Sequence, residues 1–524
     1  MSIYLKELTV VLALGVIVFT LAKPIALQFS AESDFKRRRN VWIVLTIVAL
    51  LSPSIWLFAL AALPVLFWAG RKDSNPLAFY LLILTVVPPV SHALPAIGSH
   101  QLFDIDIFRV LSFSVLIPAA WRLRKSPDSD RIRGLQGMDL LLLAYGALEA
   151  LLYVAPDPAQ TQNVVLHNSY TNVIREAFLF YVDVYVLYYV ASRTATSRSA
   201  IREALAAFVL SCTVMATIAV FESVRNWLLY TDLFALWGGD QLRTEYYVRA
   251  GLLRAEASSG HPLALGFLLT VGFGLWLYLQ TRVTGRKTRK LAVTGVLLAG
   301  LFVSFSRGPW LAALVVFLAH AAFRPGKAAR VMKAGVAVLL LGGLVLLSPL
   351  GEQLREILPF SSGAEAQSSL VYREELLHES WQIIQAHPLF GDQLALSHMQ
   401  GLRQGQGIID VVNTYLGVTL YHGFAGLALF LAFQLLPLYR MRRAARQLPP
   451  SERDDMLLTG AISATFVGII ILLADGGLHY APGSVFYALV GISEAYLAVL
   501  YAAKSQPVPA QAQSKPSIAV PESH

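Results

Sequence analysis

The chain has 524 residues, of which 56% are hydrophobic and 14% are charged. Ordinary soluble domains carry roughly 25% charged residues, so this composition excludes a disordered chain, a coiled coil and a typical soluble enzyme. The formal net charge is +9, which in a membrane protein is typical of cytoplasmic loops rather than of nucleic-acid binding. The single cysteine, Cys212, excludes an intrachain disulfide and a cysteine-based metal cluster.

The mean hydropathy of +0.57 and the recurring apolar runs predict an all-α, polytopic membrane protein with about 13–15 transmembrane helices. One straight helix over 41–69 would be about 43 Å long, well beyond the bilayer core of about 30 Å. The break at Ser52-Pro53-Ser54 therefore predicts a tight hairpin of two short helices. In chain order, the expected spans are 8–27, 41–52, 54–69, 77–91, 106–121, 138–154, 172–192, 204–224, 262–281, 291–305, 309–323, 334–350, 424–439, 456–474 and 485–503.

The basic residues predict the orientation in the membrane. Their clusters are 36–39, 71–72, 122–133, 193–202, 282–290, 324–333 and 440–453. With the hairpin, every cluster falls on one side of the membrane, and the positive-inside rule makes that side the cytoplasm. We expect transmembrane helices over 1–240, a second transmembrane region over 241–503 with a large outer loop at 351–423, and a disordered cytoplasmic tail over 504–524. The N-terminus is then expected outside.

The basic residues on the outer side are nearly all arginine, because only Lys6 and Lys23 are lysines outside the clusters and the tail. Arginine binds phosphate or carboxylate through two parallel hydrogen bonds, so this bias suggests an outward-facing anionic substrate. The alternative is that single arginines pair with nearby acids, such as Arg109 with Asp106. The outer arginines are Arg109, Arg175, Arg225, Arg243, Arg249, Arg254, Arg307, Arg355, Arg373 and Arg403.

Two of these arginines stand out by their position. The segment 305–310, Phe-Ser-Arg-Gly-Pro-Trp, joins two apolar runs with almost no loop, which places Arg307 at the outer boundary beside a helix start. The amphipathic segment 370–386 carries Arg373 in the middle of its apolar stripe, near Leu377 and Ile384. An arginine on that side needs an anionic partner. The alternatives are an interfacial anchor for Arg307, and snorkelling or an internal ion pair for Arg373.

Two further segments are candidates. Asp410 is well placed to cap the following span, and its spacing puts it on one helix face with Asn413, Thr414 and Gly417. The alternative is a capping aspartate with a packing face of small residues. The segment 249–261, RAGLLRAEASSGH, reads as a flexible outer loop that carries two arginines and a histidine.

Acidic residues in or near the spans keep an ion-coupled transporter open as an alternative function. The chain has no Gly-rich P-loop and no His-Glu-x-x-His segment. The span carboxylates are Glu149, Glu176, Asp183, Glu222 and Glu494.

An ordered set of motifs spans roughly 245–435. It consists of Gly260-His261-Pro262-Leu263-Ala264-Leu265-Gly266, Ser306-Arg307-Gly308, Arg373, Trp381, His387-Pro388-Leu389-Phe390-Gly391, Asn413-x-Tyr415-Leu416 and Gly423-Phe-Ala-Gly426-Leu427. This set resembles the O-antigen ligase and polymerase superfamily of bacterial membrane glycosyltransferases, whereas the first 240 residues match it only as a hydropathy pattern.

The resemblance implies an all-helical fold of the class-C glycosyltransferase kind in the bacterial inner membrane. It implies transfer of a glycan from undecaprenyl diphosphate at the periplasmic face, without a nucleotide sugar, a metal or another cofactor. The implied partners are lipid-linked oligosaccharide, membrane lipids and other proteins of polysaccharide export or chain-length control, with no nucleic acid. The family's outer arginines hold the lipid diphosphate, and Arg307 and Arg373 are the positions that match.

The chain departs from the ligase pattern at one position. The ligases carry a histidine just before the asparagine, and Val412 occupies that slot here. Valine cannot accept a proton, so a polymerase for exopolysaccharide or O-antigen fits better than a ligase that transfers to lipid A core or to protein. Asp410 is then the nearest candidate base, Asp392 is a second one, and His387 is expected to shape the loop.

The expected mechanism is a single displacement with inversion at the anomeric carbon. We expect Arg307, Arg373 and Asp410 to be catalytic. The residues expected to bind substrate are Arg249, Arg254, His261, Ser306, Asn413 and Tyr415.

Overall fold

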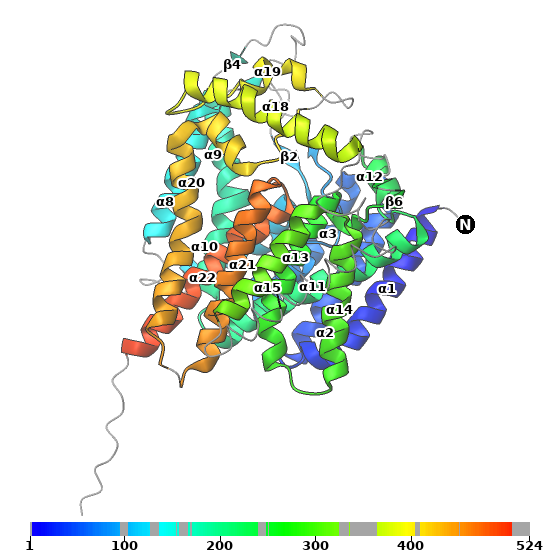
Figure 1. Cartoon of the computed structure of the whole chain (residues 1–524). Helices are drawn as coiled ribbons and strands as arrows, with labels where there is room; N and C mark the ends of the chain where they lie inside the picture. The colour runs from blue at the N-terminus through cyan, green and yellow to red at the C-terminus, as the bar shows by residue number, and fades with distance from the viewer. Residues whose placement is uncertain are drawn as a thin grey trace, which may run out of the picture.

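The computed structural model is an all-α bundle, as the sequence predicts, with α18 and α19 lying across one of its ends (Figure 1). The residues that it describes are 3–94, 103–125, 136–153, 155–156, 166–167, 170–238, 248–249, 251–323, 335, 364–403, 409–449 and 451–505.

Helices account for nearly all of the regular structure in these residues. In the first half they are α1 (Ile3–Ala26), α2 (Glu32–Leu51), α3 (Ile55–Lys72), α4 (Pro76–Ile83), α5 (Ile107–Leu111), η1 (Ser112–Leu116), α6 (Ile117–Arg124), α8 (Gly137–Leu152), α9 (Tyr170–Phe180), η2 (Tyr181–Tyr185), α10 (Val186–Thr194), α11 (Arg198–Arg225) and α12 (Thr231–Leu236). In the second half they are η4 (Ala257–Ser259), α13 (Pro262–Arg282), α14 (Lys287–Val303), α15 (Arg307–Ala322), α18 (Ala364–Ala386), α19 (Ala395–His398), η5 (Gln400–Leu402), α20 (Thr414–Arg446), α21 (Arg453–Ala474) and α22 (Ala481–Ser505).

In the described part of the chain, short strands of two residues each form three antiparallel pairs. They are β1 (His92–Ala93) with β2 (Asp104–Ile105), β3 (Ala155–Pro156) with β4 (Leu166–His167), and β5 (Val248–Arg249) with β6 (Leu252–Leu253).

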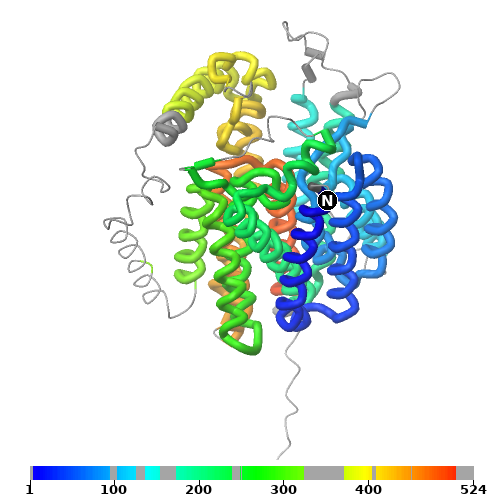
Figure 2. The backbone as a smooth tube through the Cα atoms, turned by 90° about the vertical axis from the view of Figure 1, so that its right-hand side faces the viewer, coloured from blue at the N-terminus to red at the C-terminus, as the bar shows by residue number. Residues whose placement is uncertain are grey.

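Seven of the described helices are long and apolar enough to cross a membrane, namely α1, α3, α11, α13, α20, α21 and α22. Other helices enclose most of α11 and α13, whereas most of α1 faces outward. Figure 2 shows α1 to α3 grouped on one side of the bundle and α18 above the opposite side. A helix with an outward apolar face is what a lipid environment favours, and the structure confirms a polytopic membrane protein.

The expected hairpin over 41–69 is confirmed, because α2 ends at Leu51 and α3 begins at Ile55. The Ser54 hydroxyl accepts a hydrogen bond from the backbone N–H of Leu57 and so caps α3. The first helix of the hairpin was expected to start at residue 41. This start was wrong, since α2 already begins at Glu32. The basic cluster 36–39 therefore lies inside that helix rather than before it.

The expected span 77–91 was also wrong in part. The helix α4 ends at Ile83, and the segment that follows has no regular structure up to residue 91, although its side chains are buried through Val90. The prolines at 88 and 89 cannot donate helical hydrogen bonds, which explains why the apolar run does not continue as a helix. The expected span 334–350 lies outside the described residues except for Gly335.

Ion pairs join several of the basic clusters at the end of the bundle away from α18. Arg38 lies 2.6 Å from the Asp73 carboxylate and 2.8 Å from that of Glu203. Arg202 and Arg282 both pair with Asp454 at the start of α21. These pairs bring the clusters 36–39, 193–202 and 282–290 together, as the predicted orientation requires.

The helix α20 reverses direction at Gly423, where φ is 62° and ψ is −165°. The Tyr415 hydroxyl lies 3.1 Å from Gln434 Oε1, and its ring centroid is 6.0 Å from that of Phe430. A straight helix would separate positions 415 and 434 by about 28 Å. Residues 414–422 therefore fold back beside residues 424–446, which agrees with the expectation of a span that starts at 424.

Candidate functional site

The turn between α14 and α15 brings three of the predicted arginines together. Arg249 donates to the carbonyl oxygen of Phe305 at 2.7 Å, and Arg254 donates to the Ser306 hydroxyl at 3.0 Å. Phe305 has a φ of 44°, a conformation that costs a residue with a side chain roughly 1–2 kcal/mol. The two arginines hold this turn in place, and Arg307 follows it as the first residue of α15.

A carboxylate lies at the start of α15. A Cβ atom on Gly308 would overlap Oδ2 of Asp475, so a larger residue here would displace that carboxylate. Asp475 directly follows the last residue of α21, Ala474. Because the N-terminus of a helix favours negative charge, the Asp475 carboxylate occupies a position suited to an anion.

Arg373 of α18 reaches the same carboxylate. Its guanidinium lies 2.7 Å from Oδ1 of Asp475, and 45% of the arginine side chain is exposed. The expected anionic partner of Arg373 is therefore present, in the form of an internal ion pair. Through Asp475, Arg373 and the Arg307-Gly308 helix start form one site, although α15 and α18 are separated in the chain.

Asp410 lies next to this pair. Its backbone N–H donates to the Tyr372 hydroxyl at 2.9 Å, which ties it to α18 beside Arg373. The Asp410 side chain is exposed, yet the surrounding protein raises the pKa of its carboxyl group, while the charges of His479 and Arg373 lower that pKa. Asp410 is thus a carboxylate with a raised pKa beside the arginine site.

Asp410 was expected to share a helix face with Asn413, Thr414 and Gly417. This expectation was wrong, because α20 begins only at Thr414 and Asp410 lies before it. Asn413 caps this helix, since its amide oxygen accepts from the backbone N–H groups of Tyr415 at 2.9 Å and Leu416 at 3.1 Å. The Thr414 hydroxyl donates to the carbonyl oxygen of Gly476 at 2.6 Å. These contacts hold the start of α20 against the loop that carries Asp475.

Tyr415 and His261, two of the residues expected to bind substrate, form hydrogen bonds within the protein. The Tyr415 hydroxyl donates to Gln434 and lies 3.2 Å from the carbonyl oxygen of Ile470, inside the bundle. His261 caps α13, since its Nδ1 accepts from the backbone N–H of Leu263 at 3.1 Å. Both side chains therefore stabilise the helices that surround the arginine site.

The motif 387–391 forms a loop that docks on the reversal of α20. The backbone N–H of Phe424 donates to the carbonyl oxygen of Pro388 at 2.8 Å, and that of Asp392 donates to Leu420 at 2.7 Å. Gly391 and Gly423 both have positive φ, and a Cβ atom on either would lie within 2.4 Å of the other segment's backbone. The two glycines thus allow a close backbone contact that fixes α18 above the bundle.

Val412 takes part in a second, smaller apolar cluster, against which it is partly buried. The cluster packs the apolar side of α18 on the folded-back part of α20, which gives the valine in the histidine slot a packing role. Its buried members are Leu376, Ile384, Ala395, Met399, Leu402 and Leu420.

Several span carboxylates have partners within the described residues. Arg109 pairs with Asp183 at 2.9 Å, whereas its expected partner Asp106 instead accepts from the Arg109 backbone N–H at 2.8 Å. Glu494 pairs with Arg440 at 2.9 Å. The expected pairing of Arg109 was therefore wrong, because Asp183 on the neighbouring helix accepts hydrogen bonds from the guanidinium with both Oδ1 and Oδ2.

Sequence reasoning missed Asp475 and His479. Both lie in the short loop between α21 and α22, which reads Asp-Gly-Gly-Leu-His over 475–479. A carboxylate and two glycines directly after the apolar run 456–474 were the available signal.

A comparison with protein-family models supports the earlier resemblance. The model described as O-Antigen ligase matches residues 292–431, which include Arg307, Arg373 and Asp410 and exclude Asp475. No curated protein matches the chain. Over residues 292–431 the chain is similar to the O-antigen ligase family, and the all-α fold with membrane-spanning helices agrees with that similarity.

Proposed function

We propose that this protein is a polysaccharide polymerase that transfers a lipid-diphosphate-linked glycan onto a second lipid-linked repeat unit. The observation that carries the proposal is the contact between Arg373 and Asp475 at the start of α15. It joins an exposed arginine, a helix N-terminus and the neighbouring Arg307, which together suit a diphosphate. The donor would be undecaprenyl-diphosphate-linked oligosaccharide, at the periplasmic face of the bacterial inner membrane.

The diphosphate is the leaving group of the proposed reaction. Its oxygens would take the place of the Asp475 carboxylate on Arg373, with Arg307 close by. Negative charge grows on the diphosphate as the bond to the anomeric carbon breaks, so fixed guanidinium groups stabilise the transition state more than the bound donor. No metal is required in this scheme.

The acceptor is a sugar hydroxyl of the second repeat unit. Its oxygen forms the new bond to the anomeric carbon while the electron pair of the broken bond leaves with the diphosphate. The hydroxyl proton passes to Asp410, which lies beside Arg373. One displacement of this kind inverts the configuration at the anomeric carbon.

The choice of polymerase over ligase rests on Val412. A ligase of this superfamily is expected to carry a proton-accepting histidine in that slot, whereas Val412 is partly buried in the apolar cluster beneath α18. The acceptor would therefore be another lipid-linked glycan rather than a lipid A core or a protein.

The test supplies the purified protein in lipid nanodiscs with undecaprenyl-diphosphate repeat units alone. We expect a ladder of longer lipid-linked glycans, formed equally well in the presence of EDTA. The matched control is the Arg373→Lys variant, which should give little or no ladder.

Two results would contradict this proposal. The absence of a ladder, together with transfer to added lipid A core or protein, would make the chain a ligase. Ion-dependent flux of the intact lipid-linked glycan, with no new glycosidic bond, would make it a transporter.

A further inference from the structure

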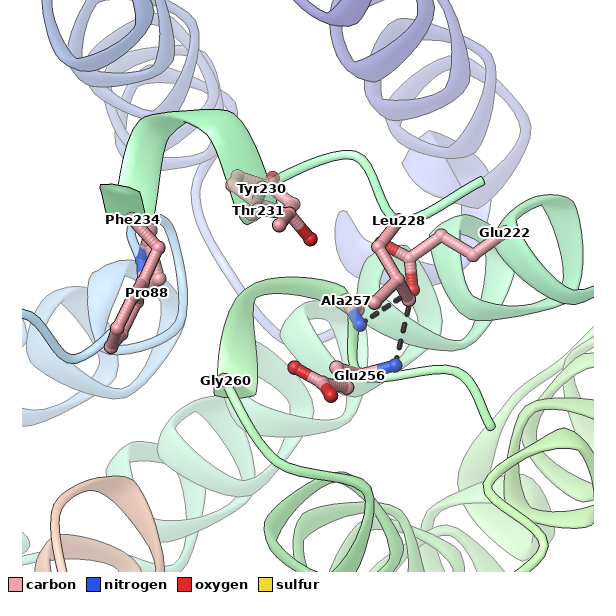
Figure 3. Close-up of a pocket in the computed structure, with 9 residues that line it drawn as sticks. All are labelled: Pro88, Glu222, Leu228, Tyr230, Thr231, Phe234, Glu256, Ala257 and Gly260. Atoms are coloured by element: carbon pink, nitrogen blue, oxygen red, sulfur yellow. Dashed lines mark hydrogen bonds between the residues drawn. The ribbon is translucent and has the colours of Figure 1, made fainter. Parts of the chain in front are cut away.

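The end of the bundle that carries α18 has two surface features of different kinds. One is a small hollow between the end of α11, α12 and the segment 256–260 (Figure 3). The buried Glu222 carboxylate in its wall already accepts from the backbone N–H groups of Glu256 at 3.1 Å and Ala257 at 2.8 Å, so this polar group serves the fold. The other feature is the loop 387–391 after α18, which exposes apolar side chains instead.

The loop 387–391 presents two adjacent large apolar side chains. Leu389 is 65% exposed and Phe390 is 55% exposed, an arrangement that water disfavours. The sequence from 380 to 391 contains no Asp, Glu, Lys or Arg, so no charged side chain holds this part of the chain in water. An exposed apolar patch of this kind marks a surface that meets protein or lipid.

The loop lies beside the first turn of a membrane-spanning helix. The backbone N–H of Phe424 donates to the carbonyl oxygen of Pro388 at 2.8 Å, and that of Ala425 donates to Leu389 at 3.1 Å. Phe424 is itself exposed. The exposed side chains of the loop therefore adjoin the start of the long apolar part of α20.

The outward side of α20 is a lipid-facing stripe. Its exposed residues Phe424, Ala428, Leu435 and Tyr439 fall within about 60° of one another on the helix. All four are apolar or aromatic, and α20 is one of the helices that can cross the membrane, so acyl chains are what covers this stripe. The loop 387–391 continues the same surface at the end nearest α18.

The length of the stripe sets the depth of the loop. Tyr439 directly precedes the basic cluster 440–453, a pattern typical of a membrane boundary. A straight helix rises about 22 Å from Tyr439 to Phe424, whereas the hydrocarbon core of a bilayer is about 30 Å thick. Phe424 and the loop docked on it therefore lie within the hydrocarbon core rather than above it.

The backbone of the loop is suited to that environment. The carbonyl oxygens of Pro388 and Leu389 are taken up by the contacts with α20, and that of His387 accepts from the backbone N–H of Gly391 at 3.1 Å. Irregular backbone is costly in lipid when its polar groups lack partners. These hydrogen bonds remove that cost for three consecutive carbonyl groups.

We propose that the loop 387–391 inserts Leu389 and Phe390 among the acyl chains of the membrane leaflet on the α18 side. The helix α18 ends at Ala386, directly before the loop, so the insertion anchors this end of the helix. Arg373 lies about 20 Å along α18 from the anchor and is thereby held at a fixed height relative to the membrane. The inference concerns lipid alone and does not depend on the proposed polymerase function.

The test places a nitroxide spin label at Phe390→Cys in the full chain, in nanodiscs of phosphatidylethanolamine and phosphatidylglycerol without isoprenoid lipid. Cys212 is buried, so the unsubstituted chain serves as the labelling blank. Electron paramagnetic resonance compares collisions of the label with oxygen, which concentrates among acyl chains, and with a water-soluble nickel chelate. Labels at Glu374→Cys, on the exposed side of α18, and at Leu435→Cys, on the lipid-facing stripe, are the aqueous and lipid references.

We expect the ratio of oxygen to nickel collisions at 390 to be severalfold higher than at 374 and close to that at 435, with an unchanged unfolding temperature. A label at Leu389→Cys should give the same result, and it replaces the first label if Phe390→Cys does not fold. Nickel collisions as frequent as at 374 would overturn the inference. So would a label that neither reagent reaches, which would indicate a protein cover, or a move into lipid only after undecaprenyl diphosphate is added, which would make its isoprenyl chain the occupant.

Discussion

The arginines at the α14–α15 turn and the arginine on α18 use the same side chain in different ways. Arg249 donates to a main-chain carbonyl group and Arg254 to a buried hydroxyl, contacts that belong to the fold. Arg373 instead binds the carboxylate of Asp475 and remains 45% exposed. A diphosphate can take the place of a carboxylate on Arg373, but it cannot take the place of the backbone at the turn. Arg249 and Arg254 therefore stabilise the structure around the site, whereas Arg373 can exchange its carboxylate partner for a diphosphate.

This difference sets the order of the expected effects. A change at a group that touches the reacting atoms should reduce the rate most, and a change at the turn should act mainly through stability. Rate and unfolding temperature are therefore the two quantities to compare across the variants below.

The largest loss is expected for Asp410→Asn. An amide cannot take the proton of the acceptor hydroxyl, so elongation should slow by roughly 10²–10⁴-fold, the usual contribution of one general base. Binding of the lipid diphosphate should be preserved, since Asp410 does not hold the donor. The rate is measured from the glycan ladder under initial-rate conditions, and full activity of the variant would remove Asp410 from the mechanism.

The pH profile is the control for that variant. The surroundings of Asp410 raise the pKa of its carboxyl group, so the protonated, inactive form persists to a higher pH than for an ordinary aspartate with a pKa of about 4. The rate of the wild type should fall as the pH drops through this raised pKa. Asp410→Asn should lack that acidic limb.

The next effect is expected for Arg373→Lys. The lysine keeps the charge but loses the planar fork that binds two phosphate oxygens, and the rate should fall about 10²–10³-fold. Because Arg373 is half-exposed, the unfolding temperature should hardly change. The same substitution at Arg225, an exposed residue at the end of α11, is the matched control. Wild-type rates in Arg373→Lys would mean that the arginine serves only as a charged anchor.

Gly308→Ala tests the contact between α15 and Asp475. The new methyl group would overlap the Asp475 carboxylate and occupy space at the start of α15, where the diphosphate is proposed to bind. We expect kcat/KM to fall about ten- to a hundredfold, because the methyl group would shift the bound diphosphate from its productive position. Gly295→Ala in α14 is the control, because that position has open space. Equal activity of the two variants would argue against the Asp475 contact.

The smallest effect on the rate is expected for Arg254→Lys. A lysine cannot reproduce the guanidinium geometry at the turn, and one lost hydrogen bond costs about 1 kcal/mol of stability. Activity should fall by less than in Arg373→Lys, and it should fall together with the unfolding temperature. A large loss of activity at an unchanged unfolding temperature would instead give Arg254 a direct contact with substrate.

Local sequence patterns predicted what depends on neighbours in the chain. The near absence of a loop placed Arg307 at a helix start, as the structure confirms. The apolar stripe predicted around Arg373 is only partly buried, because Leu377 is 57% exposed whereas Ile384 is buried. The contact of Arg373 with Asp475 could not be predicted, since it joins segments about 100 residues apart and leaves no periodic pattern in either.

The sequence predicted that a span starts at 424, but it did not reveal how the chain reverses there. The positive φ of Gly423 and its contact with the docked loop 387–391 depend on the folded backbone. The same loss of information affects His261, whose side chain caps a helix although its sequence context suggested a binding residue. A capping bond depends on backbone geometry that the residue type alone does not reveal.

The most direct test of the central claim is a cryo-electron microscopy structure of the protein in nanodiscs with bound undecaprenyl diphosphate. We predict diphosphate density between Arg373 and the N-terminus of α15, with the Asp475 carboxylate moved away from the guanidinium. Diphosphate density elsewhere, with the pair of Arg373 and Asp475 intact, would contradict it.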